Sequence, residues 1–439
     1  MPDIMPVVTD DTYAVIGAGP SGLAAARNLQ RFDIPWHGYE LSSGVGGLWD
    51  IGGPRSTVYE SAHLISSKRT TEFAEFPMRD EVADYPSHRD LLTYFRDFAS
   101  TYSLTDGFSF GTEVVSAKPS GDGGWIVVTE GPDGRVERRH AGVIAANGTL
   151  SEPSVPTFEG SFDGEVLHTS AYKSPTVFAG KRVLIIGAGN SGCDIAVDAV
   201  HHAASVDMSV RRGYYFVPKY LFGKPADTLN QGRPLPPRIK QAIDSRVLRL
   251  FTGDPVKFGF PKPDYKIYES HPIVNSLVLH HLGHGDLHVR PDVRRFAGDS
   301  VEFVDGSSTA YDVIVLATGY HLHYPFLDPA LLRWAGRGSA PDLYLNIFTQ
   351  EDPNLFVLGM IEASGIGWQG RYEQAELVAS YLRARADRPD AARALEGRVA
   401  GPRPDLSGGY RYLGLERMAY YVNKDAYRSA VRDEIERLR

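Results

Sequence analysis

The chain of 439 residues has a formal net charge of −8 and a single cysteine, Cys193. The negative charge argues against a general nucleic-acid or anionic-membrane binder, and one cysteine excludes an internal disulfide framework or a redox-active cysteine pair. No apolar run is long enough to span a bilayer, and the early first glycine motif leaves no room for a secretory leader. We therefore expect a cytoplasmic protein of about two or three domains.

The first predicted unit is a strand over Tyr13–Ile16 that turns through a glycine motif into a helix. In the spacing G-x-G-x-x-G, the first glycine permits the tight turn, the second lets a pyrophosphate approach the backbone, and the third lets helix and strand pack closely. The next apolar run ends in Glu40, where a carboxylate accepts hydrogen bonds from a ribose and disfavours a 2′-phosphate. A glycine-rich turn without a ligand is the alternative. The residues predicted to bind this first dinucleotide are Gly17, Gly19, Pro20, Ser21, Gly22 and Glu40.

Residues 44–49 contain three glycines followed by Leu48 and Trp49, a composition that favours neither helix nor strand. We expect a loop that lies against a flat ligand, with Gly47, Leu48 and Trp49 in contact with it. A surface loop with a half-buried tryptophan is the alternative.

A helix is predicted to begin near Asp90, capped by Asp90 or by Ser87 before it. Strands are predicted between residues 110 and 148, with a hairpin turn at Asp133–Gly134. The last of these strands, from residue 143 to 148, is apolar and ends in a glycine turn, as expected of a buried strand.

A second glycine motif follows a buried strand that begins at Val183, and a helical run follows it. The next predicted strand, from residue 205 to 210, ends in Arg211 and Arg212 rather than in an acid. Guanidinium groups hold phosphate oxygens with paired hydrogen bonds, as a 2′-phosphate requires. A solvated basic pair is the alternative. The residues predicted to bind this second dinucleotide include Gly187, Gly189, Asn190, Ser191, Gly192, Arg211 and Arg212.

Two unlike dinucleotide sites in one chain imply two cofactors that meet. The economical pairing is FAD in the first site and NADPH in the second, with hydride transfer from nicotinamide to flavin. The predicted fold class is α/β, with two Rossmann-like domains and the NADP domain inserted into a discontinuous FAD domain. We expect the FAD domain to span residues 1–170 and 306–439, including the C-terminal helices, and the NADP domain to span 171–305.

Residues 213–290 are predicted to elaborate the NADP domain and to help shape a substrate route. Four histidines there (His280, His281, His284 and His288) lack a carboxylate or cysteine at a recognised ligand spacing, so no metal site is predicted. A late strand, 312–320, is expected to run beside the FAD domain's 143–148 strand. A helix is expected from Glu373 to Arg385, a loop over 386–410, and a peripheral helical tail over 411–439. Further predicted FAD contacts are Val114, Ala146, Thr318 and Gly319.

Between the two glycine motifs, the chain matches F-x-G-x-x-x-H-x-x-x-Y-K at Phe162, Gly164, His168, Tyr172 and Lys173. This pattern resembles the fingerprint of class B flavin-containing monooxygenases, whereas a first-type Baeyer–Villiger relative would carry tryptophan in place of Tyr172. The resemblance extends over about residues 10–385. Other segments that look like this family are the two glycine motifs, Gly46–Trp49, and Ala317–Tyr320 followed by Pro325-Phe-Leu.

The resemblance implies that NADPH reduces FAD, that oxygen adds to the reduced flavin at C4a, and that bound NADP+ shelters the hydroperoxide. A small substrate's amine nitrogen or sulfide sulfur then takes one oxygen atom. His168, Tyr172 and Lys173 would join the domains on the NADP side rather than perform chemistry, and Tyr172 and Lys173 are predicted NADP contacts. The implied partners are a small-molecule substrate and O2, without nucleic acid or membrane, and a homodimer stays open.

One position departs from the family pattern. Many members place an asparagine beside the flavin, three residues before the lysine equivalent to Lys68, and this chain has Ile65 there. Ser66 or Ser67 could substitute, with Ser66 and Ile65 the candidate positions beside the reaction. Some relatives without this asparagine oxidise ketones in Baeyer–Villiger fashion, so that chemistry stays open. A non-catalytic flavoprotein and an uncoupled NADPH oxidase are further alternatives.

Overall fold

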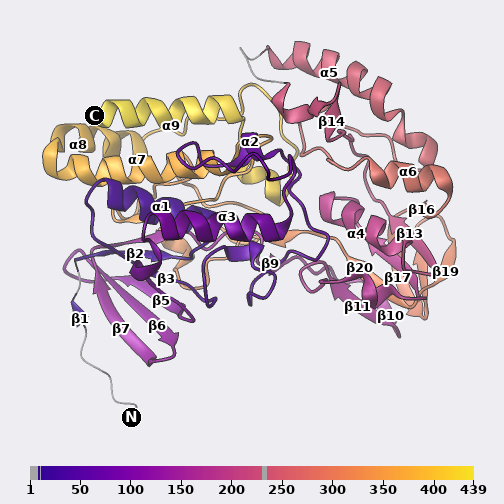
Figure 1. The fold of residues 1–439 in the computed structure, drawn as a ribbon, viewed down its shortest axis with the longest axis horizontal. Helices are drawn as coiled ribbons and strands as arrows, with labels where there is room; N and C mark the ends of the chain where they lie inside the picture. The colour runs from indigo at the N-terminus through magenta and orange to yellow at the C-terminus, as the bar shows by residue number, and fades with distance from the viewer. Residues whose placement is uncertain (1–7, 10, 230–234) are drawn as a thin grey trace.

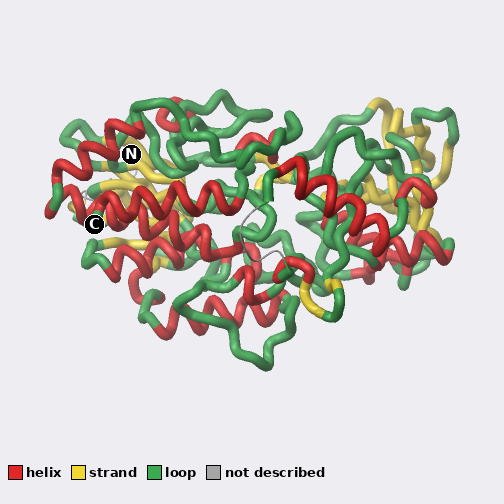
Figure 2. The backbone as a smooth tube through the Cα atoms, turned by 90° about the horizontal axis from the view of Figure 1, so that it is seen from above, coloured by secondary structure: helices red, strands yellow, loops and turns green. Residues whose placement is uncertain are grey.

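The structure, a computed structural model, describes residues 8–9, 11–229 and 235–439. Two lobes lie side by side, one containing α1, α3 and α7 and the other containing α4, α5 and α6 (Figure 1). Seen from above, loops connect the lobes near the middle of the molecule (Figure 2). Each lobe is built around a parallel sheet, so the predicted α/β class with two Rossmann-like units is confirmed.

The first lobe contains a five-stranded parallel sheet in the order β22-β8-β2-β3-β4. Its central strands are short and apolar because both faces are covered. The strands are β22 (Leu355–Val357), β8 (Gly142–Ala145), β2 (Tyr13–Ile16), β3 (Trp36–Tyr39) and β4 (Phe108–Ser109). The helices of this lobe are α1 (Pro20–Arg31), α2 (Lys68–Thr71), α3 (His88–Thr101), α7 (Gly367–Asp387), α8 (Pro389–Val399) and α9 (Lys424–Leu438).

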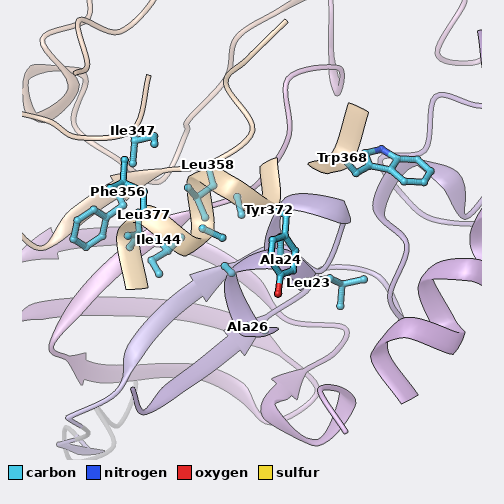
Figure 3. Close-up of a cluster of buried hydrophobic side chains, with 14 of the residues drawn as sticks. Leu23, Ala24, Ala26, Ile144, Ile347, Phe356, Leu358, Trp368, Tyr372 and Leu377 are labelled. Carbon is cyan, nitrogen blue, oxygen red and sulfur yellow. The ribbon is translucent and has the colours of Figure 1, made fainter. Parts of the chain in front are cut away.

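The core of this lobe lies between the sheet and the α1–α7 helix pair (Figure 3). Small side chains of α1, such as Ala24 and Ala26, are fully buried and let α7 approach closely. Phe356 and Leu377 fill the space beside them. This packing fixes α1 directly behind the first glycine turn.

A mixed sheet, β1-β7-β6-β5, is attached to the first lobe; β5, β6 and β7 are antiparallel neighbours, and β1 runs parallel to β7. The predicted hairpin is confirmed: Gly131 pairs with Gly134 across the turn, and Gly134 has a φ of 83°. Ser87 and Asp90 together form the capping box of α3, so both predicted cap residues take part. The strands are β1 (Val8–Thr9), β5 (Glu113–Pro119), β6 (Trp125–Gly131) and β7 (Gly134–His140).

The second lobe contains a five-stranded parallel sheet in the order β11-β20-β12-β13-β16. Its strands are β11 (Glu165–His168), β20 (Val313–Leu316), β12 (Arg182–Ile186), β13 (Ser205–Ser209) and β16 (Leu287–Arg290). A smaller sheet consists of β10 (Glu159–Phe162), β17 (Val293–Gly298), β18 (Ser300–Phe303) and β19 (Ser308–Ala310). The helices are α4 (Asn190–Val200), α5 (Pro237–Thr252) and α6 (Leu277–His284), and a small hairpin joins β14 (Tyr220–Leu221) to β15 (Lys224–Pro225).

One predicted strand pairs in a different sheet from the one that the sequence analysis expected. The strand expected beside residues 143–148 is β20, and it pairs instead with β11 and β12 in the second sheet. The predicted domain boundaries at residues 170 and 305 assign β11 and β20 to the FAD domain, whereas both strands belong to the sheet of the second lobe. Both β20 and β8 are short apolar strands before a turn, and their sequences do not reveal which sheet each joins. The two crossings between lobes meet where β9 (Glu152–Pro153) pairs with β21 (Tyr320–His321).

Two predictions about the C-terminal part of the chain, the loop over 386–410 and the peripheral tail over 411–439, were wrong. Residues 389–399 form α8 within the predicted loop, because Pro389 sits at the first helical position, where proline is favoured. The tail helix α9 is not peripheral, since Tyr427 and Val431 are fully buried in the core of the first lobe. Within the described ranges, no helix has the length and apolar character needed to cross a membrane.

Candidate active site

A cavity of about 280 Å³ opens where β2 and β8 end and the first glycine motif turns into α1. Parallel strands that end at one edge of a sheet commonly place a ligand site there. Ten of the predicted FAD contacts line this single cavity. They are Gly17, Gly19, Pro20, Ser21, Glu40, Gly47, Leu48, Trp49, Val114 and Ala146.

The three glycines of the first motif differ in what surrounds them. Gly17 has a φ of 105°, and a Cβ there would lie 2.7 Å from the carbonyl oxygen of Ala146. At Gly22 a Cβ would lie 1.7 Å from the carbonyl oxygen of Gly17, so the turn and helix require both glycines. At Gly19 the nearest atom to a Cβ is 3.5 Å away, an ordinary contact. Packing alone would tolerate a side chain at Gly19, but that side chain would occupy the cavity.

Glu40 is only 8% exposed, and backbone N–H groups hold its carboxylate in place. The N–H of Ala18, within the glycine turn, donates to Oε2 over 2.6 Å, and the N–H of Ser42 donates to Oε1 over 2.8 Å. Each oxygen keeps a lone pair for a further donor such as a ribose hydroxyl. The position fits the predicted ribose contact and also ties the turn to β3.

Asn147 is a cavity-lining residue that the sequence analysis missed. Its Nδ2 donates to the carbonyl of His323 over 2.7 Å, whereas its Oδ1 is buried without a hydrogen-bond partner among the described residues. Buried polar atoms are usually paired, so this oxygen is available to a ligand donor. Its signal in the sequence was its place two residues after the apolar strand β8.

The second glycine motif repeats the geometry of the first. Gly187 has a φ of 107°, and a Cβ there would lie 2.5 Å from the carbonyl oxygen of Ala317. At Gly192 a Cβ would lie 2.2 Å from the carbonyl oxygen of Gly187. At Gly189, by contrast, no heavy atom lies within 4 Å of the Cβ position, which leaves the backbone open for a close ligand.

The other residues predicted for this site occupy varied environments. Asn190 is used within the lobe, where its Oδ1 accepts the N–H of Val274 over 2.8 Å, and Ser191 follows it in the first turn of α4. Arg211 is exposed, whereas Nη1 of Arg212 is buried and has no partner in the described part of the chain. A buried guanidinium nitrogen without an acceptor fits an absent anion such as a phosphate.

Tyr172 and Lys173 lie between the lobes rather than at the open end of the second motif. Tyr172 is fully buried and donates its hydroxyl to Oδ2 of Asp198 over 2.8 Å. Nζ of Lys173 donates to the carbonyls of Ser56 and Val58, at 2.8 and 3.1 Å, and burial lowers its pKa. Lys173 thus links the second lobe to a backbone segment of the first.

We expect Lys173→Met to weaken this link, because it leaves the Ser56 and Val58 carbonyls without their donor. The expected loss of stability is roughly 1–3 kcal/mol, measured as a fall in the free energy of unfolding. Lys181→Met is the matched control, since among the described residues the Lys181 ammonium pairs with Glu165 alone, an exposed residue of the second lobe. Equal losses for the two variants would contradict a role between the lobes.

Three predicted FAD residues do not line the first cavity. Gly22 lies behind the turn, where its role is packing. Thr318 and Gly319 follow β20 at the crossing between lobes, where the Thr318 hydroxyl donates to the carbonyl of Ser154 and the N–H of Ser154 donates to the carbonyl of Gly319. Their placement follows from the pairing of β20 with the second sheet.

A second cavity, of about 300 Å³, lies beside the first and shares Glu362, Trp368 and Arg371 with it. Ile65 and Ser66, the two candidate catalytic positions, line this second cavity. The Ser66 hydroxyl is 2.7 Å from that of Thr71, and Ile65 offers no polar atom. A loop over residues 364–372, followed by a helix from Glu373, is predicted to lie near the flavin ring, but α7 already begins at Gly367 and carries Trp368 and Arg371 of the shared wall.

Charged groups line the second cavity on the side of the shared wall. Burial alone would raise the pKa of Glu362, but the nearby Arg417 and Arg371 outweigh it and leave the pKa lowered. Arg417 donates to Glu362 over 3.0 Å. His271 also lines this cavity, and burial, assisted by Arg417, lowers its pKa to about 4. His271 is therefore neutral at neutral pH.

This lowered pKa predicts a pH dependence of stability. The folded protein keeps His271 neutral, whereas the unfolded chain binds a proton near pH 6.5, so stability is lost as pH falls from about 6.5 to about 4. His271→Gln should remove up to about 3 kcal/mol of this loss, measured by denaturant unfolding at several pH values. The exposed His63 provides the control, and a His271→Gln curve parallel to that of His63→Gln would contradict the prediction.

One histidine cluster contains a carboxylate that the sequence analysis overlooked. His281, His284 and Asp286 each offer a ligand atom, and these atoms lie within 4.8 Å of one another. Nδ1 of His281 is 3.0 Å from Oδ2 of Asp286, and this hydrogen bond lowers the pKa of the carboxyl group. A carboxylate thus lies beside these histidines, two residues after His284, although the prediction of no metal site rested on ligand spacing alone.

Comparison with known proteins identifies the family to which this chain belongs. The model of the flavin-binding monooxygenase-like family matches residues 10–397, and the chain belongs to this family. It is thus an enzyme of the flavoprotein monooxygenase class, with FAD and NADPH as cofactors, as the fingerprint implied.

Individual relatives agree with this assignment. The chain is 31% identical to flavin-containing monooxygenase 5 of Mus musculus, over 80% of this chain and 69% of the relative. Two solved structures share the fold. A flavin-containing monooxygenase from Stenotrophomonas maltophilia has 23% identity and a TM-score of 0.64, covering 86% of this chain and 99% of its own. NADP+-bound cyclohexanone monooxygenase from Rhodococcus sp. Phi1 has 20% identity and a TM-score of 0.71, covering 98% of each chain.

Proposed function

We propose that this protein is an NADPH- and O2-dependent monooxygenase that transfers one oxygen atom to an amine nitrogen or sulfide sulfur of a small molecule. The observation that carries the proposal is the shared wall of Glu362, Trp368 and Arg371 between the two cavities. A molecule in the second cavity would lie directly against a group bound in the first.

FAD would occupy the first cavity. Gly19 leaves space beside the backbone for the pyrophosphate, Glu40 would accept ribose hydroxyls, and Asn147 Oδ1 would accept a ligand N–H or O–H. Trp49 and Leu48, in the 3-10 turn Gly47–Trp49 that replaces part of the predicted loop, would cover a flat ring. When bound, FAD supplies the redox and oxygen-activating chemistry, and the chain's task is to hold it and exclude water.

NADPH would bind at the second glycine motif. Gly189 leaves its backbone open, and Arg212, with Arg211 beside it, would hold the 2′-phosphate through its unpaired buried nitrogen. The β9–β21 pair supports an inserted NADP domain of residues 154–319. Lys173 would keep that domain against the FAD domain, so that the two cofactors meet.

Baeyer–Villiger oxidation of a ketone is a second candidate, because Ile65 and Ser66 offer little polar support in the second cavity. The Ser66 hydroxyl is already close to that of Thr71, and Ile65 cannot hydrogen-bond an amine or a peroxide. Selectivity would then depend on cavity shape and on the remaining polar groups of the wall.

Incubation of the FAD-loaded enzyme with NADPH and 18O2 tests the proposal. Separate reactions contain an N,N-dimethylalkylamine, a dialkyl sulfide and a cyclic ketone. We expect NADPH-dependent incorporation of one labelled oxygen into the amine or sulfide. A labelled lactone alone would select the second candidate. NADPH consumption with only hydrogen peroxide formed would indicate an oxidase and overturn both.

A further inference from the structure

Asp227 is a residue of the second lobe that lines the second cavity. It lies in the 3-10 turn Ala226–Thr228. Its Oδ2 accepts the backbone N–H of Ser67 over 2.7 Å and the Thr70 hydroxyl over 2.6 Å. Both donors belong to the first lobe: Ser67 follows Ser66 directly, and Thr70 lies in α2. Two polar contacts across the lobes therefore fix the carboxylate beside the proposed site of oxygen transfer.

The other oxygen of Asp227 has no such support. Oδ1 is buried and has no hydrogen-bond partner in the part of the chain that the structure describes. A buried acceptor left unpaired costs free energy, and for an anionic oxygen that cost is larger than for a neutral one. A donor brought by a ligand in the cavity would remove this cost.

The other carboxylates that line this cavity already have cationic partners. Glu362 accepts from Arg417 over 3.0 Å, and Asp244 accepts from Lys240 over 2.7 Å. Arg371, a further cation of the wall, donates to backbone carbonyls instead. Asp227 has no ion-pair partner within the described ranges, so it is the lining carboxylate to which a ligand cation would bind.

We propose that Asp227 binds a protonated nitrogen of the substrate, a step that rests on the function proposed above. A protonated nitrogen has no lone pair and cannot accept oxygen, so the atom that is oxidised must be a second one. We infer that the substrate is a small amino-substituted sulfide, held by its ammonium group and oxidised at sulfur.

The reaction balances with the co-substrates already named. The sulfide sulfur forms a bond to one atom of O2 and is oxidised to the sulfoxide, while the O–O bond breaks. The second oxygen atom leaves as water, for which NADPH supplies a hydride and solvent supplies a proton. The ammonium nitrogen is unchanged throughout.

The test compares 2-(methylthio)ethylamine with methyl propyl sulfide, which replaces the ammonium group by a methyl group. The wild-type enzyme should favour the ammonium compound at least tenfold in kcat/KM. Asp227→Asn, which can keep an acceptor for Ser67 and Thr70, should lose this preference through a higher KM for the ammonium compound alone. The FAD content should stay unchanged. Asp244→Asn is the matched control and should retain the preference.

Binding separates this proposal from the proposed function. Tryptophan fluorescence of the FAD-loaded enzyme without NADPH should report tighter binding of the ammonium compound, and Asp227→Asn should abolish the difference. Equal affinity of the wild-type enzyme for both sulfides would overturn the role of Asp227, even if both were oxygenated. Selective binding without any oxygen transfer would retain that role while refuting the monooxygenase function for sulfides.

Discussion

Replacing Gly19 by valine should give a folded protein that no longer retains FAD. The backbone at Gly19 has a φ of −75°, which any residue adopts, and a Cβ there meets its nearest atom only at 3.5 Å. The added side chain would instead fill the space reserved for a pyrophosphate. We expect the purified variant to be colourless, with FAD affinity reduced more than about a hundredfold, equivalent to about 2.7 kcal/mol or more. Flavin absorbance after gel filtration provides the measurement.

Gly121→Val is the control for this experiment. No heavy atom lies within 4 Å of a Cβ at Gly121, and the residue lies outside both cavities. It should stay yellow. A Gly17→Val variant is a weaker test, because its positive φ and the 2.7 Å approach to Ala146 would damage the fold as well. Normal FAD content in a folded Gly19→Val protein would refute the assignment of the first cavity.

Replacing Arg212 by glutamine should change the choice of reductant. Removal of the charge that faces a 2′-phosphate costs roughly 1.5–3 kcal/mol, or about ten- to a hundredfold in KM for NADPH. The KM for NADH should change little, because NADH lacks that phosphate. Steady-state reduction of the enzyme-bound flavin with each nucleotide measures the ratio, and Arg211→Gln should show a smaller change because Arg211 is exposed.

Arg294→Gln is the control, since Arg294 is an exposed arginine of the same lobe, away from the glycine motif. If Arg212→Gln and Arg294→Gln alter the NADPH to NADH preference equally, Arg212 does not read the phosphate. If the preference is unchanged in a double Arg211, Arg212 variant, the second motif binds its nucleotide without phosphate recognition.

Local sequence patterns were sufficient to predict the strand, glycine turn and helix of each of the two glycine motifs. Glycine spacing, strand hydrophobicity and helix composition predicted β2 with α1 and β12 with α4, because these signals act over a few neighbouring residues. The same reasoning placed ten residues around one cavity. It could not determine the sheet that β20 joins, since that choice depends on contacts across the whole chain.

The residues around the second cavity were harder to predict for a physical reason. Asp227, His271 and Glu362 come from irregular segments whose positions depend on packing between lobes. Nothing periodic marks them in the sequence, and their importance follows from burial and from missing partners. Residues 386–410 were predicted to form a loop because proline and glycine usually interrupt helices. This prediction was wrong for residues 389–399, since Pro389 is the first residue of α8.

The antiparallel pair β9–β21 is the place where the chain enters and leaves the second lobe. The segment that brings Asp227 to the second cavity belongs to the same lobe as the Arg212 side chain. Any pivoting of the second lobe about these two short strands would change the positions of both Asp227 and Arg212 relative to the first lobe. We therefore expect the binding of the reductant and the binding of the substrate to be coupled, so that occupancy of one site changes the affinity of the other for its ligand.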